Sequence, residues 1–146
     1  MRGKKGVSPL IATVLLIAFA VSLGAVLINL GVNLFGDPCA NRSAEVLIVE
    51  GIPRVCHSVL AKTMSLTVVN QGKKGVDGFK LSIIGNVAYN EDIPESLGPL
   101  EKKVISYPVP DLTQVDVVSI VPFYISSGQT HYCSAKQKDY TPIADC

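Results

Sequence analysis

The feature that most constrains this chain is an uncharged stretch near its start. Thirty consecutive residues, from Val7 to Gly36, include no Asp, Glu, Lys or Arg. A helix needs about 20 apolar residues to cross the hydrocarbon core of a bilayer. The apolar region of a secretory signal peptide spans only about 7–15 residues and ends at a small-residue cleavage site. We therefore expect a membrane-spanning helix that stays on the protein, with cleavage at its far end as the weaker alternative.

Both ends of this helix carry sequence signals. Ser8 can act as the N-cap, and Pro9 then occupies the first helical position, where its missing N–H leaves no hydrogen bond unmade. Gly36-Asp37-Pro38 is a stop signal. These signals predict a helix over residues 7–35 that is roughly 40 Å long, so it should tilt or project beyond the bilayer.

The charges and cysteines predict the orientation of the chain. Three basic residues, Arg2, Lys4 and Lys5, precede the apolar stretch, and the positive-inside rule places them in the cytoplasm. All four cysteines follow the stretch, which points to disulfides in an oxidising compartment. The rest of the chain should therefore lie outside the cell. A net charge of +1 gives no indication of nucleic-acid binding.

Small residues recur along one side of the predicted helix. Gly24 and Gly31 are seven residues apart, and Ala20 and Gly24 form a small-xxx-small pair. Such residues allow helix backbones to approach closely. They are also simply common in membrane helices, and the spacing alone leaves both interpretations open.

The sequence KKG followed by VSPLIATVLLIAFAVSLGAVLINL resembles the N-terminus of archaeal type IV pilins and related archaellin-like proteins. This resemblance implies a class III leader, residues 1–6, that a prepilin peptidase removes between Gly6 and Val7. The helix would first anchor the subunit in the membrane. After extraction by an assembly ATPase and its membrane platform, it would pack with copies of itself in a filament core.

One position departs from the bacterial members of this group. Bacterial type IV pilins usually have a Glu at the fifth mature position, where this chain has Ile11. Many archaeal pilins also lack that Glu, so the departure favours the archaeal group. The register between helices would then depend on the shape of the packing surface alone.

After a short linker, residues 36–43, the pattern changes to runs rich in Val, Ile and Tyr that are separated by Gly, Pro and Asn. Such runs predict strands of a sandwich or barrel. The segment with SLTVVNQGKKGVDGFKLSIIG and the segment LGPLEKKVISYPV resemble parts of extracellular immunoglobulin-like modules. We expect residues 44–146 to form an all-β, immunoglobulin-like sandwich of about seven strands, over residues 45–51, 54–60, 64–72, 78–86, 102–109, 114–125 and 129–135.

Four cysteines allow three pairings. Pairing of neighbours in sequence favours Cys39–Cys56 and Cys133–Cys146. A zinc site that uses His57 and His131 beside these cysteines is the weaker alternative, because the usual ligand spacings are missing.

Other candidate sites are few. Asn41-Arg42-Ser43 is an N-glycosylation sequon in an exported position. Glu91, Asp92 and Glu95 lack the ligand spacing of a calcium loop and are expected to form a solvated acidic loop. The sequence contains no common catalytic motif and no phosphate-binding glycine loop, so we expect neither an enzyme nor a cofactor.

The resemblance implies a structural function, namely polymerisation into an extracellular filament. A single-pass, N-in surface protein whose sandwich binds a partner is the alternative, and a minor pilin lies between the two. Cleavage after Gly6 would distinguish filament subunits from a plain membrane anchor.

Overall fold

The computed structural model describes residues 9–146, and for residues 32–35 the backbone only. The chain divides into two compact units, Met1–Pro38 and Cys39–Cys146. We call the second of these the outer unit. It begins five residues before the predicted boundary at residue 44, because the segment from Cys39 onward is already bound to the strands.

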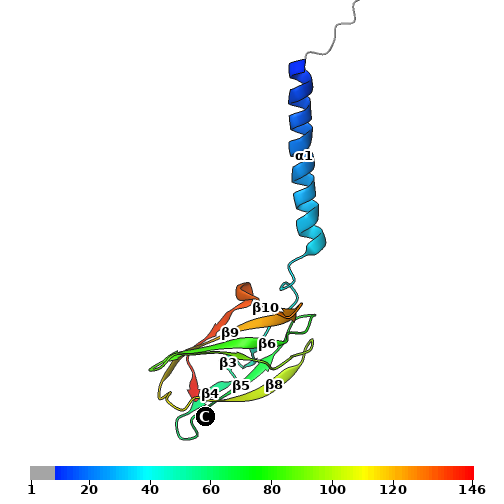
Figure 1. Cartoon of the computed structure of the whole chain (residues 1–146). Helices are drawn as coiled ribbons and strands as arrows, with labels where there is room; N and C mark the ends of the chain where they lie inside the picture. The colour runs from blue at the N-terminus through cyan, green and yellow to red at the C-terminus, as the bar shows by residue number, and fades with distance from the viewer. Residues whose placement is uncertain (1–8) are drawn as a thin grey trace, which may run out of the picture. The chain divides into compact units, whose positions relative to one another are not determined.

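The first unit contains one helix, α1 (Pro9–Phe35), which ends at the predicted residue (Figure 1). The two residues before Pro9 that were predicted as helical lie outside the described part of the chain. Gly36 follows the helix with a φ of +47°, a conformation that glycine adopts without strain and that commonly ends helices. The predicted stop signal therefore lies where the helix ends.

The outer unit is rich in strands, and the part of the chain described here has twelve of them rather than about seven. One five-stranded sheet contains β1 (Glu45–Val46), β4 (Val55–Ser58), β5 (Thr63–Val69), β8 (Lys102–Pro108) and β12 (Ala144–Asp145). The other contains β6 (Gly78–Gly85), β7 (Tyr89–Ile93), β9 (Val115–Ser126), β10 (Gln129–Tyr132) and β11 (Lys138–Tyr140). A small ribbon pairs β2 (Ile48–Val49) with β3 (Ile52–Pro53), and a 3-10 turn, η1 (Ser134–Lys136), follows β10.

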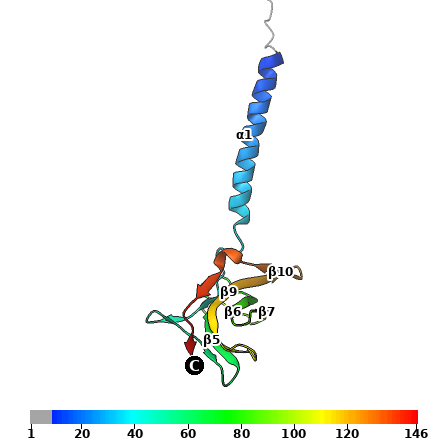
Figure 2. The ribbon, with the colours of Figure 1, turned by 90° about the vertical axis from the view of Figure 1, so that its left-hand side faces the viewer.

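One apolar core is shared by both sheets. Along β5 every second residue is buried, and along β6 Phe79, Leu81 and Ile83 are each at most 1% exposed, as their alternation predicted. Figure 2 shows β6, β7 and β9 in one layer and β5 in the other. The largest buried side chains come from both layers: Phe79, Met64, Leu66, Leu81, Ile83 and Ile120.

A tyrosine joins the two sheets at their edge. Tyr140 on β11 is 7% exposed, and its hydroxyl oxygen accepts the N–H of Val46 on β1 at 2.8 Å. Burial raises the pKa of Tyr140 to about 12, because the charged phenolate is disfavoured away from water. The neutral phenol therefore connects a short C-terminal strand to the first strand of the opposite sheet.

The first predicted strand, residues 45–51, is interrupted. The N–H of Leu47 donates to the carbonyl of Thr67 on β5, and its own carbonyl accepts the N–H of Arg54. Residues 48–53 lie between these two bonds and leave the sheet as the β2–β3 ribbon. Its turn is at Glu50 and Gly51, which both have positive φ, rather than at the predicted Gly51-Ile52-Pro53.

The predicted disulfide pairing is wrong. The bonds are Cys39–Cys133 and Cys56–Cys146, with Cα–Cα distances of 5.5 and 5.0 Å, within the usual range for disulfides. The β9–β10 hairpin ends at Cys133, whose N–H donates to Pro122, and β12 runs parallel to β4 and brings Cys146 to Cys56. Strand pairing, rather than proximity in sequence, therefore determines the partners.

This correction changes the expected stabilisation. The bonded cysteines are 94 and 90 residues apart. In the chain-entropy model, closing loops of this length stabilises the fold by about 4–5 kcal/mol for each bond taken alone, against about 3 kcal/mol for short loops.

The pairing can be checked by peptide mapping. Trypsin separates the four cysteines into four peptides, and Cys56 and Cys146 lie in VCHSVLAK and DYTPIADC. After digestion without reductant, with free thiols blocked, we expect these two peptides at their summed mass less two hydrogens. A VCHSVLAK peptide linked to the peptide that contains Cys39 would contradict the structure.

Candidate functional site

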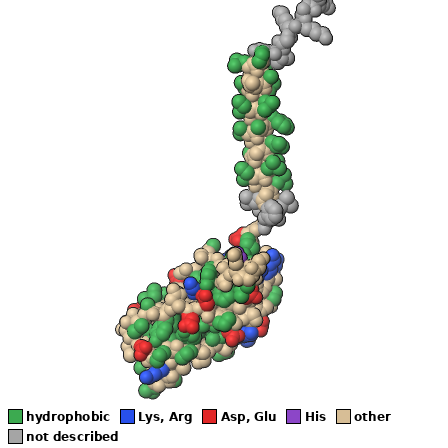
Figure 3. Space-filling model, in the orientation of Figure 1, with side chains coloured by type: hydrophobic (Ala, Val, Ile, Leu, Met, Phe, Trp, Pro, Cys, Tyr) green, Lys and Arg blue, Asp and Glu red, His purple; other side chains and the backbone are tan. Residues whose placement is uncertain are grey.

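The candidate functional surface is helix α1, which is apolar on every side. Among the side chains of this helix that the structure describes, the large apolar ones are between 48% and 74% exposed, from Leu23 to Leu10. A helix that is apolar all round is normally buried in a membrane or in a protein core. The span Pro9–Gly31 is long and apolar enough to cross a bilayer. Figure 3 shows apolar and no charged side chains along the described part of this helix.

Two hydroxyl side chains on α1 bond to the helix itself. The hydroxyl of Thr13 donates to the carbonyl of Leu10 at 2.8 Å, and that of Ser22 donates to Phe19 at 2.9 Å. Both hydroxyl protons are thus satisfied without water, which suits an apolar environment.

The three predicted packing residues share one face of the helix. At about 100° per residue, Gly24 and Gly31 lie about 20° apart around the axis, and Ala20 lies about 40° from Gly24. A Cβ atom added to either glycine would meet nothing within 4 Å. Contacts within this chain therefore do not require glycine at these positions, although glycine destabilises a helix by about 1 kcal/mol relative to alanine.

The predicted leader and its cleavage site lie outside the residues that the structure describes, namely Arg2, Lys4, Lys5, Gly6 and Val7. Ile11, at the position of the bacterial Glu, is 52% exposed.

The sequon lies where the chain enters the outer unit. Asn41 is exposed, and its backbone carbonyl accepts the N–H of Lys74 at 2.9 Å. The hydroxyl of Ser43 accepts the N–H of Gln71 at 2.9 Å. The acceptor side chain of the sequon is thus exposed, while its serine takes part in the fold.

A stacked group of side chains fixes the same segment, and sequence reasoning missed it. The guanidinium of Arg42 lies 4.4 Å from the ring centroid of Tyr124 and donates to the carbonyl of Gly75. The rings of Tyr124 and His131 are stacked at 5.1 Å, because these residues are register partners on β9 and β10. Together with the bond from Cys39, this group attaches the start of the outer unit to the β9–β10 hairpin.

The weaker zinc prediction placed a metal beside Cys56 and Cys133. Both cysteines form disulfides, so neither has a thiolate that could bind a metal. His57 is only 3% exposed, and its Nε2 has no hydrogen-bond partner in the protein. Among the described residues, no three His, Cys, Asp or Glu side chains gather as metal ligands would.

The acidic segment is a strand rather than a loop, because Glu91 and Asp92 lie on β7. The hydroxyl of Tyr107 donates to Glu91, and that of Tyr132 donates to Asp92 at 2.6 Å. The hydrogen bond to Glu91 is the main cause that raises the pKa of Tyr107 to about 12, and the bond to Asp92 likewise raises the pKa of Tyr132.

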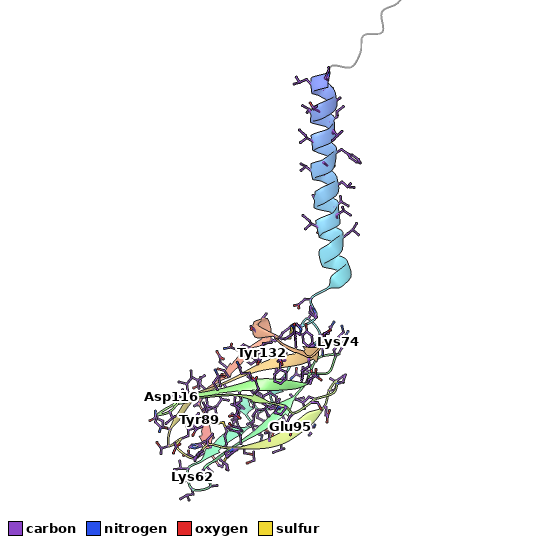
Figure 4. All side chains as sticks on the ribbon, viewed as in Figure 1. Lys62, Lys74, Tyr89, Glu95, Asp116 and Tyr132 are labelled. Atoms are coloured by element: carbon purple, nitrogen blue, oxygen red, sulfur yellow. A yellow bond between two sulfur atoms is a disulfide. The ribbon has the colours of Figure 1, made fainter. Side chains whose placement is uncertain are left out.

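The third acidic residue, Glu95, follows β7 and lies 3.6 Å from the ammonium of Lys103. The three carboxylates thus have three different partners, which come from β8 and β10. Figure 4 shows Glu95 and Tyr132 at separate places on the outer unit.

The β2–β3 ribbon has a hollow on each side. One, of about 320 Å³, is lined by Ile52, Arg54, Thr67 and the Cys56–Cys146 disulfide. The other, of about 300 Å³, lies between Ile48 and the segment Lys138–Thr141. Ile48 and Ile52 are 56% and 61% exposed, so the ribbon presents apolar side chains to solvent.

No family model, curated protein or solved structure matches this chain.

Proposed function

We propose that this protein is a structural subunit of an extracellular filament of the archaeal type IV pilus kind. The observation that carries the proposal is helix α1, which is apolar on every side and bonds the hydroxyls of Thr13 and Ser22 to its own backbone. Such a helix is stable in a bilayer and, outside it, only when other apolar surfaces cover it. Copies of the same helix supply that cover in a filament core.

In this proposal the subunit is first a membrane protein, with Arg2, Lys4 and Lys5 in the cytoplasm and the outer unit outside the cell. Prepilin peptidase removes residues 1–6, and the assembly ATPase with its membrane platform moves the subunit into the filament. Burial of apolar surface between helices stabilises the polymer by about 25 cal/mol per Å².

The outer unit would be displayed on the filament surface as an immunoglobulin-like sandwich. Two sheets around one core, antiparallel except where β12 pairs with β4, support this architecture. Its two disulfides suit an oxidising, extracellular location. Surface display would allow the outer unit to contribute to adhesion.

A glycan on Asn41 would add to this surface. The side chain is exposed, which leaves room for a sugar. Because Ser43 is engaged by Gln71 in the folded unit, glycan transfer to Asn41 would precede the folding of this segment.

The mature N-terminus tests the proposal. In protein sheared from the cell surface, we expect mass spectrometry to find a chain that begins Val7-Ser8-Pro9. A chain that begins at Met1 and remains in the membrane fraction would contradict the filament function.

That contrary outcome would instead favour a membrane-anchored binding module. The hollows on both sides of the β2–β3 ribbon, with Ile48 and Ile52 exposed, are the observation that supports this second candidate.

A further inference from the structure

The two disulfides are interleaved, and this arrangement has a mechanical consequence. In sequence order the cysteines pair first with third and second with fourth, Cys39 with Cys133 and Cys56 with Cys146. Tension applied between Cys39 and Cys146 can therefore be carried along two short covalent paths, each through one disulfide, which we call shortcuts. One crosses to Cys133 and continues through 13 residues to Cys146, and the other passes through 17 residues to Cys56 and crosses there.

We propose that the outer unit can extend only a short distance under tension, because either disulfide alone prevents it from unravelling from its ends. An extended chain spans at most about 3.6 Å per residue, so the two shortcuts limit the separation of Cys39 and Cys146 to about 45 Å and about 60 Å. The 107 residues between them would span about 370–390 Å without any disulfide. Pairing of sequence neighbours would leave 77 residues free to extend, about 270 Å.

The positions of the cysteines fit this role. Cys39 is the first residue of the outer unit, so it is the first to receive a pull transmitted along the chain from helix α1. The shortcut through Cys133 places β1 to β10 on a branch that the tension bypasses. Cys133 is 2% exposed, which shields this bond from reductants in solution.

Weaker contacts hold both ends in place around the covalent bonds. The N–H of Arg42 donates to Cys39 in a turn, and the Arg42 side chain lies on Tyr124. At the other end, the N–H of Cys146 donates to the carbonyl of His57, and β12 pairs with β4. Both ends are therefore held by non-covalent contacts with the sheets as well as by the disulfides.

The source of the pull rests on the proposed function, since an assembled or anchored helix transmits force to the outer unit. The covalent limit does not depend on it. Failure to find a filament would leave the extension limit intact, and failure of the limit would leave filament assembly untouched.

Optical tweezers can measure the limit on the full chain in detergent micelles, with handles before Met1 and after Cys146. Helix α1 contributes the same length in every variant, so differences between variants come from the outer unit. We expect the oxidised protein to extend about 320 Å less than the same protein after reduction.

Two double variants test whether each remaining pair of cysteines forms its bond and limits the extension by itself. When oxidised, Cys39→Ser/Cys133→Ser and Cys56→Ser/Cys146→Ser should each extend to within about 20 Å of the oxidised wild type. The quadruple serine variant should match the reduced protein. The limit is set by covalent bonds, so it holds whether or not a variant folds stably. Extension of either oxidised double variant by about 200 Å or more beyond wild type would overturn the proposal.

Discussion

Replacement of Gly24 and Gly31 together by leucine is expected to abolish filament assembly while the separate subunit stays intact. Within the chain, a Cβ atom at either position meets nothing within 4 Å, so the side chains fit. Leucine also favours the helix by about 0.8 kcal/mol per site relative to glycine. Between closely packed helices, by contrast, each leucine would force the backbones apart.

Overpacking of this kind costs about 1–3 kcal/mol per site, so two sites should weaken assembly by at least about 20-fold per subunit. The matched control is Ala18→Leu with Ala25→Leu. These residues are exposed and likewise seven apart, but they lie about 100–140° around the helix from the glycines. The control adds the same kind of side chain to a different face.

The ratio of sheared surface protein to membrane-retained protein measures assembly, and cleavage after Gly6 is followed in parallel to show that processing is intact. We expect the glycine variant to accumulate as processed protein in the membrane, while the control yields filaments. Equal filament yields from both variants would show that the face with Ala20, Gly24 and Gly31 is not a packing surface.

The elements that the sequence predicted well are those with a local physical cause. The helix follows from a charge-free stretch between Pro9 and Gly36. Strands β5 and β6 follow from alternation, because every second residue is buried along β5 and from Phe79 to Ile83 along β6. In each case the pattern lies within the element and needs no knowledge of its neighbours.

The missed strands depend on partners instead. β7 carries three consecutive polar residues, Asn90 to Asp92, and only Ile93 is buried, so it has no alternation to detect. It is a strand because five of its residues pair with β6. β12 has only two residues, and its pairing with β4 is parallel and distant in sequence.

The same distinction applies to the candidate site. The small-residue face of α1 is local and could be predicted from spacing. The stack of Arg42, Tyr124 and His131 could not, because Tyr124 and His131 meet through the register of β9 with β10, and Arg42 comes from a segment some 80 residues earlier. The disulfide pairing failed for this reason as well, since Cys133 lies at the end of the same hairpin and Cys146 reaches Cys56 through the pairing of β12 with β4.

Substitution of Asn70 by alanine should destabilise the outer unit more than most single changes. Asn70 is 0% exposed and follows β5. Its Nδ2 donates to the carbonyls of Lys74 at 2.8 Å and Leu97 at 3.2 Å, and its Oδ1 accepts the N–H groups of Gly72 at 2.8 Å and Ser43 at 3.3 Å. One side chain thus joins three segments that are far apart in the sequence.

Alanine removes all four bonds of a fully buried amide, and the backbone groups of Ser43 and Gly72 that lose their partner are themselves partly buried. Each unsatisfied group costs about 1–3 kcal/mol, and Leu97 retains a bond from Val76, so we expect a loss of about 3–4 kcal/mol. That is a large part of the 5–15 kcal/mol typical of a domain's stability.

Asn86→Ala is the matched control. Asn86 makes three similar bonds, to Asp111, Thr113 and Gln114, but it is exposed, so water can replace the lost partners. We expect a loss of about 1 kcal/mol there.

Urea titration of the full chain in detergent, followed by tyrosine fluorescence, compares the two variants. The chain has no tryptophan, and all five tyrosines lie in the outer unit, so the signal reports on that unit alone. If Asn70→Ala lowers the free energy of unfolding no more than Asn86→Ala does, then burial of the Asn70 hydrogen bonds adds nothing to the stability of the outer unit. A loss three to four times as large as that at Asn86 would mean that the segments at Ser43, Gly72 and Leu97 depend on one buried amide, at the start of the outer unit.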